Sequence, residues 1–131
     1  MTIEKVVLNI VRILLGGSIY YMLETVVRGY SHWSMFILGG VCFLGCGIVN
    51  EMAGNSISTW KKMVWCMIII TVFEFLTGII VNVKLGWHIW DYSGMPLHVM
   101  GQICVPYMFL WYGISGIAIW INKMCDKVAQ M

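Results

Sequence analysis

Charged residues are scarce in this chain. Asp, Glu, Lys and Arg make up 11% of its 131 residues, whereas hydrophobic residues make up 60% and aromatic residues 14%. Soluble domains carry about 25% charged residues, so the composition excludes an ordinary water-soluble domain. Eight basic residues nearly balance six acidic ones, which excludes a polybasic surface, and no nucleic-acid partner is expected. We predict a multi-pass protein of the cell membrane, with membrane lipids as its first partners.

Proline-rich and polar linkers are also missing. The chain has two prolines and no low-complexity segment between its apolar runs. The amino terminus has no small-residue cleavage pattern after its first apolar run, so we expect that run to remain as a span. We therefore predict one four-helix transmembrane domain over residues 1–131. No part of it is left to form a nucleotide-binding domain, so any ATP hydrolysis would belong to a separate ATPase.

Paired cysteines and metal-ligand patterns are absent as well. The five cysteines are odd in number and contain no C-x-x-C motif, which argues against a disulfide framework or a thiol-redox centre. His88, Asp91 and His98 match no metal-ligand spacing. We therefore expect no metal and no cofactor.

Four long apolar runs are present. A membrane-spanning helix needs about 20 such residues, and backbone groups in lipid must be satisfied within the segment, so each run is predicted to be a helix. Pairs of glycines within the runs favour close helix packing. The predicted helices cover residues 6–27, 33–50, 62–83 and 99–121.

An even number of spans places both termini on one side of the membrane. Basic residues gather on that side and are fewer on the other, which predicts that both termini are cytoplasmic. The connection from 84 to 98 then faces outward as a structured outer loop. The basic residues on the terminal side are Lys5, Lys61, Lys62, Lys123 and Lys127.

Glu74 lies midway along the third apolar run. A charge at that depth is costly, so the carboxyl group should face the bundle, carry a proton or meet a partner. Thr71, Gly78 and Asn82 follow at helical spacing and form one polar stripe with it. Glu74 is either part of an ion or solute path or a protonated acid hydrogen-bonded to a neighbouring helix.

Further polar residues are expected in the outer half of the domain. Glu24 and Arg28 are four residues apart and can form an ion pair, which could equally be a hydrated feature of the interface. Asp91 could bind a ligand or cap a turn near Ser93. Pro106 is expected to kink the fourth helix near Gln102. The predicted substrate-binding residues are Glu24, Arg28, Glu74, Asn82, Trp90, Asp91, Tyr92, His98 and Gln102.

The segment from residue 73 to 116 carries a specific pattern. It contains Glu-Phe followed by Thr-Gly, then W-D-Y-S-G-M-P, G-Q-I-C and a tryptophan in the last helix. In these motifs the chain resembles a family of small bacterial integral membrane proteins described as putative ABC-transporter type IV permeases. The resemblance implies a four-helix membrane fold and a permease-like role beside an ATPase.

Three functions follow from these observations. The first is a membrane transport component that binds a small solute or ion, as a homo-oligomer or with partner membrane subunits. The second is a membrane-embedded enzyme acting on lipids or lipid-linked substrates, with Asp91 or His98 as general acid or base. It ranks lower because no nucleophile is paired with a base. The third is a non-catalytic helper subunit of a membrane complex.

Overall fold

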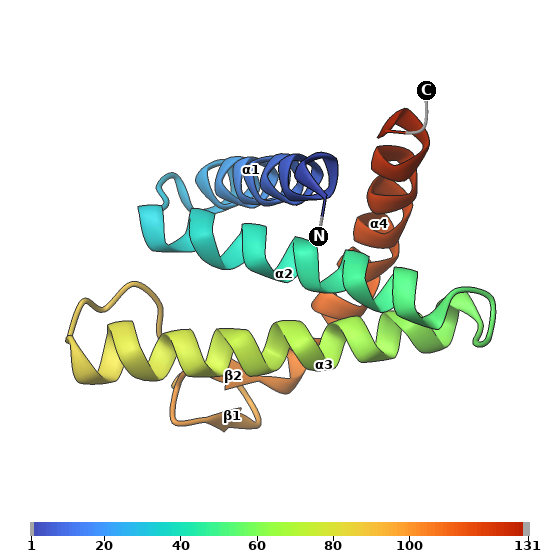
Figure 1. Cartoon of the computed structure of the whole chain (residues 1–131). Coiled ribbons are helices and arrows are strands. Elements are labelled where there is room, and N and C mark those ends of the chain that lie inside the picture. Colours follow the sequence, from blue (N-terminus) through green and yellow to red (C-terminus); the bar gives the residue numbers. More distant parts are fainter. Residues whose placement is uncertain (1, 130–131) are drawn as a thin grey trace.

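The computed structural model describes residues 2–129 as four long helices joined by a short π-helix, a hairpin and loops (Figure 1). The outermost residues of the predicted domain, 1, 130 and 131, lie outside the described part. The elements, in order, are α1 (Ile3–Arg28), α2 (Trp33–Ala53), α3 (Thr59–Gly78), the π-helix η1 (Ile79–Lys84), β1 (His98–Val99), β2 (Ile103–Cys104) and α4 (Val105–Ala129).

Local sequence signals explain where the helices begin and end. The Thr2 side chain accepts a hydrogen bond from the backbone N–H of Lys5, and Ser58 accepts one from Lys61, so both residues cap a helix start. Gly29 ends α1 in the left-handed conformation, with φ of 85°, and its N–H donates to the Thr25 carbonyl. Glycine adopts this conformation at little cost.

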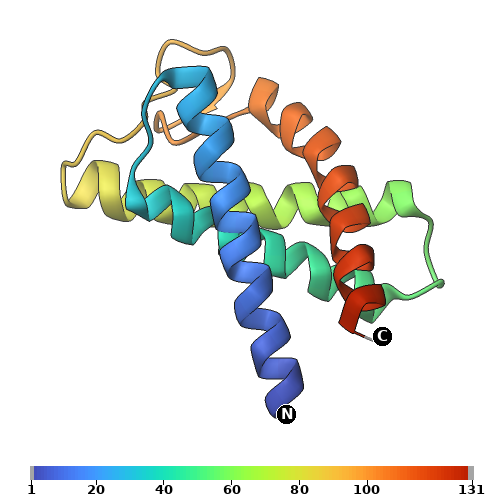
Figure 2. The ribbon, with the colours of Figure 1, turned by 90° about the horizontal axis from the view of Figure 1, so that it is seen from above.

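The helices pack in a layered arrangement. α2 and α3 lie against each other, α1 packs mainly on α2, and α4 packs on both α3 and α2 (Figure 1). α1 and α4 touch each other much less. Seen from above, both termini and the turn between α2 and α3 lie toward one end, and the connection between α3 and α4 lies toward the other (Figure 2). The cytoplasmic orientation of the termini stays a prediction.

Close backbone contact joins α1 to α2. A Cβ atom built on Gly17 would lie 2.4 Å from the Phe36 carbonyl oxygen, and one on Gly40 would lie 2.5 Å from that of Ile13. Only glycine fits at such distances, which confirms that these glycines serve tight helix packing. An ion pair between Lys5 and Glu51 at 3.1 Å also joins α1 to α2, and one between the side chains of Arg12 and Asp126 joins α1 to α4.

Three helical segments within residues 2–129 are long and apolar enough to cross a membrane. They are α1, α2 and the continuous segment of α3 and η1, Thr59–Lys84. α4 is not among them, so the fourth span stays a prediction. Many apolar side chains of the helices face outward, including Ile10, Leu14 and Leu76, each at least half exposed. Such a surface is expected where lipid is the solvent.

The fourth helix begins later than the sequence predicts. Residues 98–104 form an antiparallel hairpin in which His98 pairs with Cys104 and Val99 with Ile103. Met100 and Gly101 have φ of 53° and 72°, which no α-helix accommodates. Pro106 lies in the first turn of α4, where its missing N–H costs nothing. The predicted kink near Gln102 is therefore wrong.

The helix after Gly78 widens before it ends. In η1 the bonds run from residue i to i+5, as when the Leu85 N–H donates to the Ile80 carbonyl at 2.9 Å. The next hydrogen bond closes a larger turn, from residue i to i+6, because the Trp87 N–H donates to the Val81 carbonyl at 2.8 Å. π-helical turns occur often at functional sites, and this one carries the buried Asn82.

Candidate functional site

Glu74 lies in α3 with only 2% of its surface exposed. The hydroxyl group of Tyr92 donates to its Oε2 atom at 3.0 Å, and the indole N–H of Trp111 donates to Oε1 at 3.3 Å. Among residues 2–129, no basic side chain forms an ion pair with it. Glu74 is thus a buried carboxyl group with two neutral donors.

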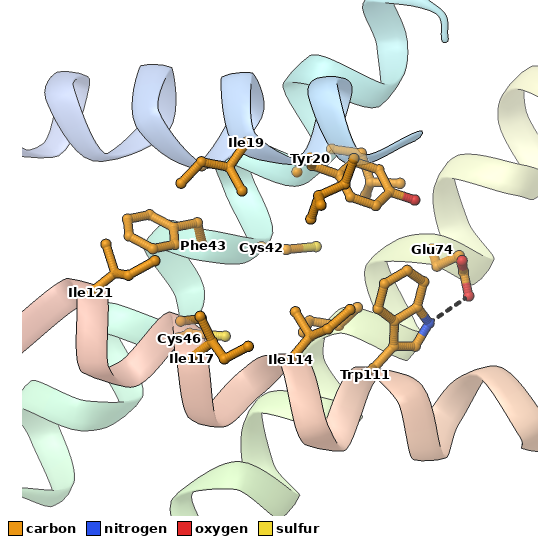
Figure 3. Close-up of a pocket in the computed structure, with 16 residues that line it drawn as sticks. Ile19, Tyr20, Cys42, Phe43, Cys46, Glu74, Trp111, Ile114, Ile117 and Ile121 are labelled. Carbon is orange, nitrogen blue, oxygen red and sulfur yellow. Dashed lines mark hydrogen bonds between the residues drawn. The ribbon is translucent and has the colours of Figure 1, made fainter. Parts of the chain in front are cut away.

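A cavity of about 140 Å³ adjoins Glu74. It lies between α1 and α4, over α2 and α3, and Figure 3 shows Glu74 and Trp111 at one end of it. Glu74 is the only acidic or basic side chain among its described lining residues. The lining consists of Gly16, Ile19, Tyr20, Leu23, Leu38, Gly39, Cys42, Phe43, Cys46, Ile70, Glu74, Trp111, Ile114, Ile117, Ala118 and Ile121.

Aromatic rings surround the carboxyl group. Tyr20 meets Trp111 edge to face with ring centroids 6.0 Å apart, and Tyr92 stacks on Tyr107 at 4.7 Å. Burial raises the pKa of the Tyr92 hydroxyl group above its usual value, and the nearby Glu74 raises it further. Tyr92 therefore stays protonated and remains a donor to Glu74 at neutral pH.

Asn82 holds the connection between α3 and α4 against the helices. Its Oδ1 atom accepts from the backbone N–H groups of Ile89 at 2.7 Å and Trp90 at 3.4 Å, and its Nδ2 donates to Gln102 Oε1 at 2.9 Å. The Trp90 indole N–H donates to the Gln102 carbonyl at 3.0 Å. These hydrogen bonds hold the loop in position, and Asn82, Trp90 and Gln102 do not line the cavity.

Glu24 and Arg28 form the ion pair that their spacing predicts. Arg28 Nη1 lies 2.6 Å from Glu24 Oε1, and Nη2 donates to the Ile89 carbonyl and the Tyr30 hydroxyl group, both at 2.8 Å. Arg28 therefore fastens the end of α1 to the loop. Glu24 Oε2 is buried without a hydrogen-bond partner among the described residues.

Asp91 and His98 are exposed and serve the loop backbone. Asp91 Oδ1 accepts from the Ser93 N–H at 2.8 Å, and His98 Nδ1 accepts from the Gly101 N–H at 3.1 Å. Neither residue lines the cavity. The predicted residues thus divide into groups: Glu74 with Tyr92, Asn82 with Trp90 and Gln102, Glu24 with Arg28, and these two at the loop surface. Their part in substrate binding stays a prediction.

The capping role of Asp91 predicts a pH-dependent stability. The hydrogen bond from the Ser93 N–H holds the pKa of this carboxyl group below its ordinary value of 3.8. A lowered folded-state pKa adds stability above the unfolded-state pKa, and this is lost as pH falls through the folded-state value. At neutral pH the wild type should therefore unfold at a slightly higher temperature than Asp91→Asn, and this difference should not change with pH there. The difference should shrink below about pH 4; one that grows in acid would contradict this role.

Sequence reasoning missed part of the cavity. Tyr20 could have been found, because it falls on the i, i+4 ladder that leads from Arg12 through Gly16 to Glu24. Trp111 belongs to the family pattern, but nothing in the sequence indicates its contact with Glu74, which lies 37 positions away. No group of three or more His, Cys, Asp or Glu side chains that could hold a metal occurs in the part described.

Comparison of the sequence with known proteins identifies a family. The family described as putative ABC-transporter type IV matches residues 11–131, which is nearly the whole chain. No curated protein and no solved structure matches the chain. Together with the three long apolar helices, the match gives an all-α membrane protein with a transport-related role. The chain belongs to the putative ABC-transporter type IV family.

Proposed function

We propose that this chain is a membrane transport component in which Glu74 and its cavity bind a small solute or ion. One observation carries the proposal: a buried carboxyl group without a basic partner in the described chain borders a cavity. A charged residue at the centre of a membrane costs about 2.5–3.5 kcal/mol on the lowest scale. A residue that serves only packing would not need an ionisable side chain.

The outer loop contributes directly to this site. Tyr92 belongs to the loop between α3 and α4 and donates directly to Glu74, so any movement of the loop changes the hydrogen bonding of the carboxyl group. We assign Asn82, Trp90, Gln102, Glu24 and Arg28 to holding this loop in place. Asp91 and His98 shape its exposed surface.

The proposed topology has four spans, with α4 as the fourth. Both termini then face the cytoplasm and the loop faces outward, as the distribution of basic residues predicts. A separate ATPase, a second membrane subunit or a second copy of this chain would complete the transport system. The family match supports partners of this general kind.

The experiment measures solute binding by the purified protein in uncharged detergent micelles. A panel of cations, anions and neutral solutes is screened for an increase in unfolding temperature, since a bound ligand stabilises the native state. We expect at least one solute to bind, and Glu74→Gln to weaken it at least about tenfold. Hydrogen bonds to charged groups contribute about 1.5–3 kcal/mol, and tenfold corresponds to about 1.4 kcal/mol.

Glu51→Gln is the matched control, because Glu51 is exposed and, among residues 2–129, forms an ion pair only with Lys5. It should bind the same solute with unchanged affinity. The proposal fails if no solute stabilises the wild type, or if Glu74→Gln binds as tightly as the control. Membrane insertion and the elution volume of both variants should match the wild type, so that a loss of binding is not a loss of folding.

A further inference from the structure

We infer that the cavity beside Glu74 takes a lipophilic primary ammonium ion with one ring-sized apolar group. The inference rests on the proposed function, since it names the class of solute for that site. It draws on the carboxyl group of Glu74, the aromatic wall, the size of the cavity and the direction in which the cavity opens.

The charge requirement comes from the hydrogen bonds of Glu74. A carboxylate accepts about four hydrogen bonds, and Tyr92 and Trp111 supply two. The Trp111 indole can only donate, so the oxygen that it meets must be an acceptor. When Glu74 is ionised, its buried charge lacks a partner, which is costly. An ammonium group in the cavity would supply the missing positive charge and further N–H donors.

The aromatic wall favours the same sign of charge. Tyr20 and Trp111 both line the cavity near Glu74, with ring centroids 6.0 Å apart (Figure 3). The face of an aromatic ring attracts cations and is best developed in tryptophan. An anion would meet the carboxyl group of Glu74 instead. A calcium or magnesium ion would need about six oxygen ligands, far more than Glu74 and the Tyr20 hydroxyl group could supply.

The size and lining of the cavity define the rest of the ligand. Its volume is about 140 Å³, and beyond Glu74 its walls are mainly aliphatic or aromatic, as at Ile19, Phe43 and Ile114. An apolar cavity of about 150 Å³ in another protein stays dry and binds benzene. One ring or a short branched chain therefore fills this space, and a larger drug-like molecule would extend beyond it.

The opening of the cavity lies at the outer surface of the helices. Among the lining residues, Leu23 of α1 is 50% exposed and Ile117 of α4 is 60% exposed. The cavity thus opens between two helices that touch each other little and have apolar outer faces. In the proposed topology this side meets lipid, so a solute that partitions into the bilayer could enter from it.

The test compares benzylammonium with benzyl alcohol, which has nearly the same size without the charge. Binding is measured by calorimetry at pH 7 in an uncharged maltoside detergent. Wild type should bind benzylammonium at least tenfold more tightly than benzyl alcohol. Glu74→Gln should remove this preference, and Glu51→Gln should keep it. Ala118→Leu places a larger side chain in the cavity and should weaken both ligands while Glu74 is intact.

The outcomes separate this inference from the function on which it rests. If another solute of the panel binds through Glu74 but benzylammonium does not, the ammonium class is wrong and the transport site stands. If no solute depends on Glu74, both proposals fail. Equal binding of the two benzyl ligands by wild type also overturns the inference, as does an unchanged affinity in Ala118→Leu, which would place the ligand outside the cavity.

Discussion

Asn82→Leu should lower the free energy of unfolding by about 3–5 kcal/mol and release the loop between α3 and α4. Leucine has a similar size but removes the partners of the Ile89 and Trp90 N–H groups and of Gln102 Oε1. Each buried group left without a hydrogen bond costs about 1–3 kcal/mol. Denaturation in detergent micelles measures the loss, and limited proteolysis of the loop reports its release.

Asn55→Leu is the matched control for this change, because Asn55 lies exposed in the turn between α2 and α3. Exposed substitutions of this kind usually change stability by less than about 0.5 kcal/mol. Asn82 does not hold the loop between α3 and α4 if the two variants unfold at the same denaturant concentration and this loop resists protease equally in both.

Gly17→Ala should destabilise the protein by about 1–3 kcal/mol, in the range of other overpacked cores. The new Cβ atom would lie 2.4 Å from the Phe36 carbonyl oxygen. That oxygen belongs to the backbone of α2, so the helices must move apart to make room. The unfolding temperature in detergent checks the size of the effect.

Gly113→Ala offers the opposite expectation in the same protein. A Cβ atom at Gly113 meets nothing within 4 Å. Alanine favours helix over glycine by up to about 1 kcal/mol, so this variant should be neutral or slightly more stable. Equal destabilisation by the two alanine variants would show that the close contact between α1 and α2 is not the cause of the lost stability in Gly17→Ala.

The first three helices could be predicted from the sequence because their signals are local. Long apolar runs, the caps at Thr2 and Ser58, and the glycine at residue 29 all act within a few residues of the helix that they define. The stripe of Thr71, Glu74, Gly78 and Asn82 is likewise a matter of spacing, and all four residues are buried.

The hairpin before α4 escaped prediction because the apolar run continues through it. Val99, Ile103 and Cys104 read as the start of a helix, and the decisive feature is the left-handed backbone at Met100 and Gly101. Methionine gives no hint of such a conformation, since it rarely adopts a positive φ. A glycine alone within an apolar segment is equally compatible with helix packing.

The candidate site could be predicted only in part, for a related reason. The pairing of Glu24 with Arg28 follows from residues four apart on one helix. The contacts of Glu74 with Tyr92 and Trp111 join residues 18 and 37 positions apart, and depend on how the loop and α4 lie against α3. The sequence predicts Asp91 and His98 at the depth of the other polar residues, but their hydrogen bonds are to the loop backbone.

The π-helical turn bears on how this chain is aligned with others. A bond from i to i+5 encloses one residue more than a bond from i to i+4, so η1 holds an extra residue between Gly78 and the loop. Deleting it would tighten the segment into ordinary helix and rotate Asn82 away from the groups it binds. A homologue with an uninterrupted third helix would therefore need a one-residue gap at this place, and its loop would need a different anchor.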